Sequence, residues 1–236
     1  KLSDFSNIMA NGKIAMKLDD GDALVGVALA APDDHFLLAT RHGKAIRFPI
    51  TDVRVFAGRS SSGIRGVALA SKDRVISMTI LHGAEIDPET RDSYLRMAAS
   101  RRREAGEDLG DDQPLIEAEF LGLQRQEEHI LTVANDGYGK RTSAYDYRVT
   151  RRGGKGIDLM DLMPKSEVVA AFPVSDSDGL VLVTDGGQLI RVPVQDIRIA
   201  RRSTRGVRLF SLGSGERVVS VSRIIDENDE SEPADR

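Results

Sequence analysis

An internal repeat of about 50 residues is the feature that most restricts how this chain can fold. Four glycines head matching segments; six positions after each lies a leucine, and six positions further lies an apolar pair. The glycines are Gly12, Gly63, Gly156 and Gly206, the leucines are Leu18, Leu69, Leu162 and Leu212, and the pairs begin at Leu24, Val75, Val168 and Val218. A period of this length is typical of solenoids, propellers and repeat arrays. The sequence therefore predicts one supersecondary unit repeated along the chain.

The other half of each unit repeats in three copies. Each copy has a turn glycine, an arginine four positions after it, and an Asp-x-Arg motif that begins five positions after that arginine. The turn glycines Gly43, Gly137 and Gly187 separate short apolar runs that are typical of strands. Pro49 and Pro193 restrict the second strand of two units to a sheet edge or a strand end. We therefore predict an all-β chain, a β-propeller or similar radial repeat of four-stranded blades, with about three full repeats and part of a fourth.

One unit is interrupted by an insertion. Gly63 and Gly156 are 93 residues apart, whereas the other neighbouring repeat glycines are 51 and 50 residues apart, which places about 43 extra residues at about 82–124. Asp87 and Pro88 begin a run of helix formers, so we expect a helix over about 88–105, followed by a loose acidic stretch over 106–113. The chain is thus predicted to be one domain over 1–225, with an acidic, disordered tail over 226–236. Because its start lacks an initiator Met and a signal peptide, we expect an N-terminally truncated fragment.

Charge and composition narrow the function. The net charge is −4, but residues 226–236 alone hold six acids and one base, so the rest of the chain is close to neutral. Cysteine is absent, which excludes disulfides and thiol chemistry, and no apolar run approaches the roughly 20 residues of a membrane span. The four histidines show no ligand spacing, and the tyrosines fall in the insertion or at repeat positions. We expect no catalytic residues, no metal site and no membrane contact.

Basic residues recur at two places in each unit, on the strand after the turn glycine and in the loop that follows the Asp-x-Arg motif. In a radial repeat these positions lie at equal intervals around the rim, where they can neutralise the phosphates of a curved duplex without reading its sequence. Glycines in the stretch from Thr150 to Gly156 would let the backbone approach a phosphate path closely. The candidate DNA-binding residues are Lys44, Arg47, Arg54, Arg59, Arg65, Lys140, Arg141, Arg148, Arg151, Arg152, Gly153, Gly154, Lys155, Gly156, Arg191, Arg198, Arg201, Arg202, Arg205 and Arg208.

The stretches 151–156 (Arg-Arg-Gly-Gly-Lys-Gly) and 135–142 resemble motifs of the DNA gyrase A C-terminal domain, and the likeness covers nearly the whole chain outside the insertion and the tail. The resemblance implies a β-pinwheel, a propeller variant whose blades exchange strands. It implies a domain that wraps double-stranded DNA around its rim and so supports ATP-dependent negative supercoiling by the complete type II topoisomerase. Thr150 stands where the family's box has Gln, and the box falls in a late repeat here, so its special role is not carried over.

The same resemblance implies the setting in which the domain works. The implied partners are the gyrase B subunit, together with a second copy of gyrase A, in an A2B2 enzyme located in the bacterial cytoplasm at the nucleoid. This fragment would hold no cofactor, since ATP and Mg²⁺ are expected on gyrase B. The catalytic tyrosine is expected outside this chain.

Two other interpretations stay open at this point. One is the corresponding domain of topoisomerase IV, which steers substrate choice, although the stretch 135–141 and the acidic tail favour gyrase. The other is a propeller that binds protein partners at its central face, in which case the rim arginines would only aid solubility. The acidic tail would act either as a solubilising segment or as a competitor of DNA, and the role of the insertion is not assigned by the sequence.

Overall fold

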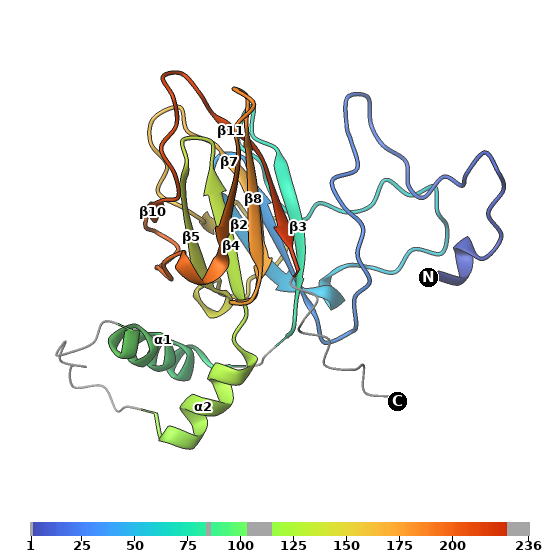
Figure 1. Cartoon of the computed structure of the whole chain (residues 1–236). Helices are drawn as coiled ribbons and strands as arrows, with labels where there is room; N and C mark the ends of the chain where they lie inside the picture. Colours follow the sequence, from blue (N-terminus) through green and yellow to red (C-terminus); the bar gives the residue numbers. More distant parts are fainter. Residues whose placement is uncertain (1, 84–85, 103–114, 226–236) are drawn as a thin grey trace.

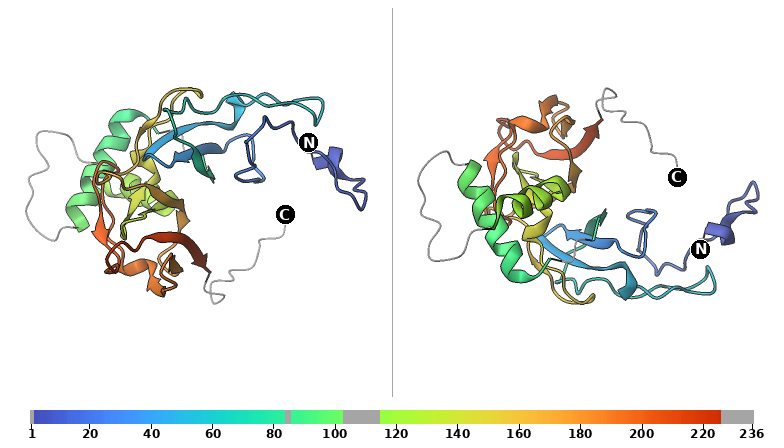
Figure 2. Two further views of the ribbon diagram at one scale, coloured as in Figure 1. Left: turned by 90° about the horizontal axis from the view of Figure 1, so that it is seen from above. Right: turned by 90° about the horizontal axis from the view of Figure 1, so that it is seen from below.

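The structure, a computed structural model, describes residues 2–83, 86–102 and 115–225. Its strands form three antiparallel sheets, here called blades, that stand side by side in an arc (Figures 1 and 2). Blade 1 consists of β1 (His35–Thr40), β2 (Lys44–Pro49), β3 (Val75–Leu81) and β6 (Ile157–Asp158). Blade 2 consists of β4 (His129–Ala134), β5 (Tyr138–Ser143), β7 (Val168–Val174) and β10 (Val207–Arg208). Blade 3 consists of β8 (Gly179–Thr184), β9 (Leu189–Pro193) and β11 (Val218–Ile224).

Neighbouring blades exchange strands. Blade 1 has the order β3-β1-β2-β6, blade 2 the order β7-β4-β5-β10 and blade 3 the order β11-β8-β9. The chain leaves β5 in blade 2 and crosses to blade 1, where β6 pairs with β2 in the register Lys44↔Asp158. It then returns to blade 2 as the innermost strand β7. In the same way β10 comes from the blade 3 segment but pairs with β5. The predicted repeat of four-stranded blades is confirmed for blades 1 and 2.

The repeat glycines are required by backbone geometry at the turns and at the crossings. Gly43, Gly137 and Gly187 lie in the hairpin turns with φ of 79°, 83° and 83°, a conformation that favours glycine. Gly156 directly precedes the crossing strand β6 with φ of 75°, and a Cβ there would lie 2.5 Å from the carbonyl oxygen of Ala45. Pro193 ends β9, as the sequence predicted, and a 3-10 turn follows each hairpin. These turns are η2 (Ile50–Asp52), η3 (Ala144–Asp146) and η4 (Val194–Asp196), and a fourth, η1 (Leu2–Phe5), begins the described chain.

The hydrophobic core lies between the blades. One cluster joins blades 1 and 2 and includes Leu37, Leu81, Ile130 and Tyr147. A second joins blades 2 and 3 and includes Leu131, Leu180 and Ile197 among others. The x residue of the Asp-x-Arg motif, Tyr147 or Ile197, is almost fully buried in each cluster. Each blade therefore depends on its neighbours for the burial of its apolar residues.

The insertion interrupts a tight turn between two strands. In the uninterrupted copy, a carboxylate oxygen of Asp178 accepts a hydrogen bond from the backbone N–H of Ser175 at 2.7 Å, and Asp34 does the same for Ala31. Glu128 holds the equivalent position, and it accepts from the N–H of His82 at 2.9 Å across the insertion. The hydrogen bond that closes the turn is therefore kept, and the inserted residues project outward between His82 and Glu128.

Two helices fill the described part of the insertion, α1 (Pro88–Arg102) and α2 (Glu117–Gln126). The predicted start of α1 is confirmed, while residues 103–114 and the tail 226–236 lie outside the described residues. Helix α2 was not predicted, although acidic residues in its first turn and Arg125 in its last turn fit the helix dipole and offered a signal. The helices pack on blade 2 through Tyr94, Phe120 and Tyr145, where the ring of Tyr94 lies 5.0 Å from that of Phe120 and 5.4 Å from that of Tyr145.

The first unit has no neighbour on its N-terminal side among the described residues. Residues 6–34 and 53–74 form no strand, although they contain the repeat glycines Gly12 and Gly63 and the apolar pair that begins at Leu24. Leu18 and Leu69 are exposed there, whereas their repeat equivalents Leu162 and Leu212 pack into the two inter-blade clusters. The described helices include none that is long and apolar enough to cross a membrane. Within the same residues, no group of three or more His, Asp or Glu side chains is arranged to hold a metal ion.

Candidate nucleic-acid interface

The predicted basic residues divide into three classes by exposure. Those that are exposed are Arg54, Arg65, Arg148, Arg151, Arg152, Lys155, Arg191, Arg198, Arg201 and Arg208, together with Gly154. Those that are partly exposed are Lys44, Arg59, Arg202 and Arg205, together with Gly153 and Gly156. Arg47, Lys140 and Arg141 are buried, with 4%, 0% and 6% of their surface exposed. The expectation that these three face solvent on the rim is wrong, and we leave them out of the proposed DNA contacts.

Arg47 and Arg141 hold one blade to the next. The guanidinium of Arg47 donates to the Nδ1 atom of His35 at 3.1 Å and to the carbonyl of Ala144 at 2.9 Å. Arg141 donates to the carbonyl of Ile197 at 2.6 Å and forms an ion pair with Asp176. Burial lowers the pKa of Arg47, but these bonds offset part of the cost of desolvating a guanidinium. Arg191 has the same repeat position but is exposed, since no described blade follows blade 3.

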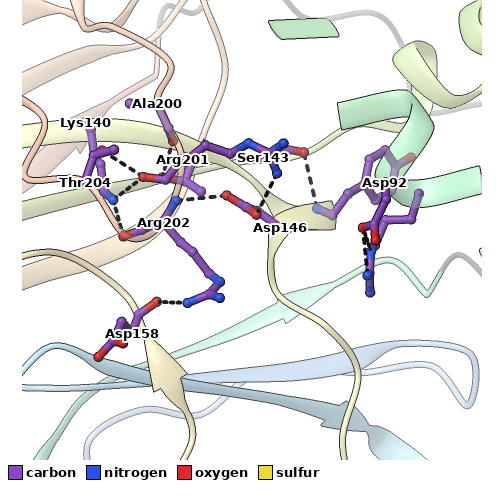
Figure 3. A network of polar contacts seen from close by, with 12 residues as sticks. Asp92, Lys140, Ser143, Asp146, Asp158, Ala200, Arg201, Arg202 and Thr204 are labelled. Atoms are coloured by element: carbon purple, nitrogen blue, oxygen red, sulfur yellow. Dashed lines mark hydrogen bonds and ion pairs between the residues drawn. The ribbon is translucent and has the colours of Figure 1, made fainter. Parts of the chain in front are cut away.

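Lys140 supports the loop that follows it in the next unit. Its Nζ donates to the carbonyl of Arg201 at 2.7 Å and to the carbonyl of Arg202 (Figure 3). Burial is the main cause that lowers the pKa of Lys140 to about 7; nearby Arg202 lowers it further, while Asp146 and Asp161 oppose the shift. The sequence suggested a rim contact here, but the side chain points inward and organises backbone.

Two junction loops carry most of the exposed cations, the first junction loop (residues 147–156) and the second junction loop (residues 197–206). In the first, the carboxylate of Asp52 accepts from the N–H of Arg152, and in the second Asp146 accepts from the N–H of Arg202 at 2.8 Å. The side chain of each arginine then donates to a backbone carbonyl, that of Arg65 for Arg152 and that of Asp158 for Arg202, both at 3.1 Å. Sequence reasoning noted the repeated aspartate but missed its function, which is to anchor the loop of the next unit (Figure 3).

Three cations of the second junction loop and of the outer strands, each at least partly exposed, form ion pairs with carboxylates. Arg201 lies 3.4 Å from Asp146, and Arg205 lies 3.1 Å from Asp161. Lys44 forms an ion pair of 2.5 Å with Asp158, and this hydrogen bond lowers the pKa of Asp158. Because exposed pairs of this kind contribute only about 0–1 kcal/mol each, a phosphate can replace the carboxylate partner at little cost.

The glycines of the first junction loop serve the packing between blades. The N–H of Gly153 donates to the carbonyl of Gly66 at 2.6 Å, and the carbonyl of Gly154 accepts from Ala68 at 2.9 Å. The positive φ of Gly153 (81°) and the close approach of Gly156 to Ala45 account for glycine at these two positions, whereas a Cβ at Gly154 would make only ordinary contacts. The close approach that the sequence suggested toward a phosphate path is made here toward the protein's own backbone.

Sheets that exchange their outer strands with the next blade around a common axis define a β-pinwheel. A model of the family described as DNA gyrase C-terminal domain, beta-propeller, matches residues 1–31, 34–82, 128–175 and 180–225. The chain therefore belongs to the family of DNA gyrase A C-terminal domains.

Curated relatives agree with this assignment. The chain is 49% identical over 175 residues to the DNA gyrase A protein of Granulibacter bethesdensis, and 47% identical over 163 residues to that of Rickettsia bellii. The gyrase A protein of Staphylococcus aureus is 31% identical over 156 residues. Each alignment covers 66% of this chain but 19%, 18% and 13% of the relative, so the chain matches about a fifth or less of their length.

Solved structures show the same fold. A DNA gyrase A C-terminal domain superposes with a TM-score of 0.66 at 21% identity, over 94% of this chain and 60% of that one. The C-terminal domain of DNA topoisomerase IV superposes with a TM-score of 0.65 at 18% identity, over 89% of this chain and 53% of that one. The predicted pinwheel architecture is confirmed.

Proposed function

We propose that this domain binds duplex DNA along the outer edge of its blades, without sequence preference, and bends the duplex around that edge. The observation that carries the proposal is the equal placement of Arg151 and Arg201. Both are exposed, both lie on junction loops anchored by the equivalent aspartate (Asp52 for the first and Asp146 for the second), and they are separated by one repeat. Cations at regular intervals on a curved edge suit a duplex backbone, whose phosphates provide affinity but little sequence information.

The energetics require contacts that recur along the edge. Bending about 40 base pairs through half a turn costs on the order of 10 kcal/mol by the elastic estimate. A single exposed ion pair contributes only about 0–1 kcal/mol, so one basic patch would not suffice. Several phosphate contacts with release of counterions would offset the bending energy. The remaining candidate contacts in this proposal are Lys44, Arg54, Arg59, Arg65, Arg148, Arg152, Lys155, Arg191, Arg198, Arg202, Arg205 and Arg208.

We further propose the setting that family membership suggests. The domain works in an enzyme that contains a second copy of gyrase A, together with gyrase B subunits, which bind ATP and Mg²⁺, in the bacterial cytoplasm. Its part is to present wrapped DNA, and the chemistry of strand cleavage lies elsewhere in the enzyme. The high identity to gyrase A proteins favours this role over that of topoisomerase IV. Negative supercoiling by the complete enzyme, lost when this domain is removed, is the expected result; simple relaxation by both forms would contradict it.

The binding itself is tested by fluorescence anisotropy with duplexes of unrelated sequence. We expect similar affinity for all duplexes and a steep loss of affinity as salt rises, because each neutralised phosphate adds about 0.9 to the slope of log K against log salt. The double variant R151Q/R201Q should lower that slope by roughly two. The variant R74Q is the control, since Arg74 directly precedes the innermost strand β3 and lies away from the outer edge. Affinity that does not change with salt would refute the proposal, and a protein-interaction role would then become the better hypothesis.

A further inference from the structure

The insertion lies beside the proposed DNA path. Helix α1 is on the outer side of the arc of blades, as Figure 2 shows, and its last residue, Arg102, faces the second junction loop. The family match leaves out residues 83–127, so this arrangement is not part of the shared pinwheel. The helices therefore add a surface to the edge at the junction between blades 2 and 3.

A cavity of about 500 Å³ separates α1 from the second junction loop. Leu95, Ala99 and Arg102 line it from α1, and residues 195–201 and 204–206 line it from the other side. Five arginines border the cavity, against two aspartates, Asp146 and Asp196. These arginines are Arg102, Arg141, Arg198, Arg201 and Arg205. The cavity thus has an excess of positive charge and one side built by the insertion.

The arginines are not equally available to a ligand. Arg141 is buried and bonded to backbone carbonyls, and Arg201 and Arg205 each have a carboxylate partner. Arg102 and Arg198 are exposed, and the ion pairs formed among the described residues include neither of them. Two guanidinium groups on opposite sides of one cavity are therefore available to a single anion. Guanidinium groups match the oxygens of a phosphate by donating paired hydrogen bonds.

The position of α1 is set by specific packing rather than by the repeat. Tyr145 packs edge-to-face on Tyr94 at 5.4 Å and donates a hydrogen bond from its hydroxyl to the carbonyl of Leu123 at 3.0 Å. The corresponding residues of the other units are Thr51 and Gln195, which have no ring. The docking site for the helices is thus specific to blade 2, and it holds Arg102 at the cavity.

We propose that this cavity receives a backbone phosphate of duplex DNA, so that the inserted helix α1 extends the DNA path at the junction of blades 2 and 3. The inference rests on the proposed function of the outer edge. It assigns the insertion to DNA contact, with Arg102 as the residue that it contributes and Arg198 as its counterpart on the junction loop. A phosphate in the cavity would be held without readout of the bases, in keeping with binding that has no sequence preference.

The test is a comparison of R102Q with R125Q by anisotropy with a 40-base-pair duplex. Arg125 belongs to the same insertion and is exposed like Arg102, but it lies on α2 and does not line the cavity. At 0.1 M salt, the loss of one phosphate contact should weaken binding about eightfold and reduce the salt slope by about 0.9. We expect this for R102Q and for R198Q, and we expect R125Q to bind as the unaltered chain does. Equal affinity for R102Q and the unaltered chain would overturn the inference.

A deletion gives an independent arm. Residues 83–127 are replaced by Asp-Ser, the pair that occupies this place after β7 as Asp176 and Ser177. The shortened chain should lose affinity to the same degree as R102Q, and R198Q in that background should have a smaller effect than in the unaltered chain. If the shortened chain folds, as judged by circular dichroism, and binds DNA as tightly as before, the insertion has no part in the path and the inference is wrong.

Titration with free phosphate tests whether the cavity binds a backbone phosphate of DNA or only a free phosphate ion. Inorganic phosphate titrated into the chain is expected to compete with the duplex, and R102Q should weaken the binding of both. Binding of inorganic phosphate that R102Q removes, with DNA affinity unchanged, would make the cavity an anion site off the DNA path and overturn the inference. The variant R151Q distinguishes failure of this inference from failure of the proposed function, because Arg151 is not among the residues that line this cavity. If R151Q weakens DNA binding and R102Q does not, only this inference fails; if neither does, the proposed function fails as well.

Discussion

The two junctions between blades use the same bonds but carry different charges. At both, a buried arginine of the preceding blade donates to the backbone of the next blade, Arg47 of blade 1 at the first junction and Arg141 of blade 2 at the second. At both, the backbone carbonyl of that arginine accepts from the junction loop, at 2.8 Å from the N–H of Thr150 or of Ala200. The repeated residues therefore build one scaffold twice.

The residues that differ between the junctions decide what the scaffold presents. Lys140 at the second junction stands where the first has Ile46, and it binds the carbonyls of the second junction loop. Arg208 lies over the ring of Tyr138 at the second junction, whereas the first has Asp158 paired with Lys44 at the equivalent place. At this pair of positions the first junction thus has a cation neutralised by a carboxylate, whereas Arg208 at the second forms none of the ion pairs found among the described residues. The repeated residues fix the geometry of the junctions, and single residues that differ between the repeats set the local charge.

The largest expected effect on stability comes from replacing the arginine that is buried at each junction. R47A and R141A should each lower the free energy of unfolding by about 2–4 kcal/mol, because carbonyls inside a junction lose their donors. R191A changes the same repeat position where no described blade covers it, and it should alter stability by less than about 0.5 kcal/mol. Urea denaturation followed by circular dichroism measures all three. Similar small losses at all three positions would mean that burial by the next blade does not decide the role of this arginine.

A smaller effect on the free energy of unfolding is expected when Lys140 is replaced, and this effect depends on pH. The pKa of Lys140 is about 7 in the folded chain, whereas an unfolded lysine has a pKa of about 10.4. Between these values the unfolded state binds more protons, so stability should rise with pH through this window. Relative to K140I, which copies Ile46, the unaltered chain should gain about 2 kcal/mol between about pH 7 and pH 9.

The control for this comparison is I46V, which removes one methyl group at the first junction and introduces no titrating group. Its difference from the unaltered chain should not vary over the same range of pH. A constant difference between K140I and the unaltered chain would show that Lys140 stays charged, held by its two carbonyl acceptors, and the two junctions would then differ in charge even at high pH.

The smallest expected effect concerns the outer charge of the first junction. D158N removes the partner of Lys44, so Lys44 becomes available to a phosphate, and DNA affinity at 0.1 M salt should rise by up to about eightfold. D22N changes the net charge by the same amount at an exposed position away from the outer strands, and it should have little effect. Anisotropy at two salt concentrations measures both. An equal gain for the two variants would mean that net charge, rather than the outer edge of the first junction, controls binding.

Much of this fold could be predicted because its signals are local. The turn glycines, the prolines that end β2 and β9 and the apolar runs between them act within a few residues, and they recur at fixed offsets. The exposure of the candidate site could not be predicted in the same way. Arg47, Arg141 and Arg191 are indistinguishable within the repeat, yet two are buried and one is exposed. Helix α2 could have been predicted from the sequence, whereas its docking on Tyr145 depends on a contact between segments that are distant in the chain.

The sequence by itself determined the repeat, the hairpins and the places where exposed bases can recur, since these follow from backbone conformation and from the spacing of apolar residues. The tertiary structure alone decided which of those bases face solvent and which join blades, because burial depends on whether a neighbouring blade is present. It also decided that the inserted helix stands beside the second junction loop, where Arg102 meets Arg198 across one cavity. That arrangement brings together residues from separate units, and no pattern within either unit encodes it.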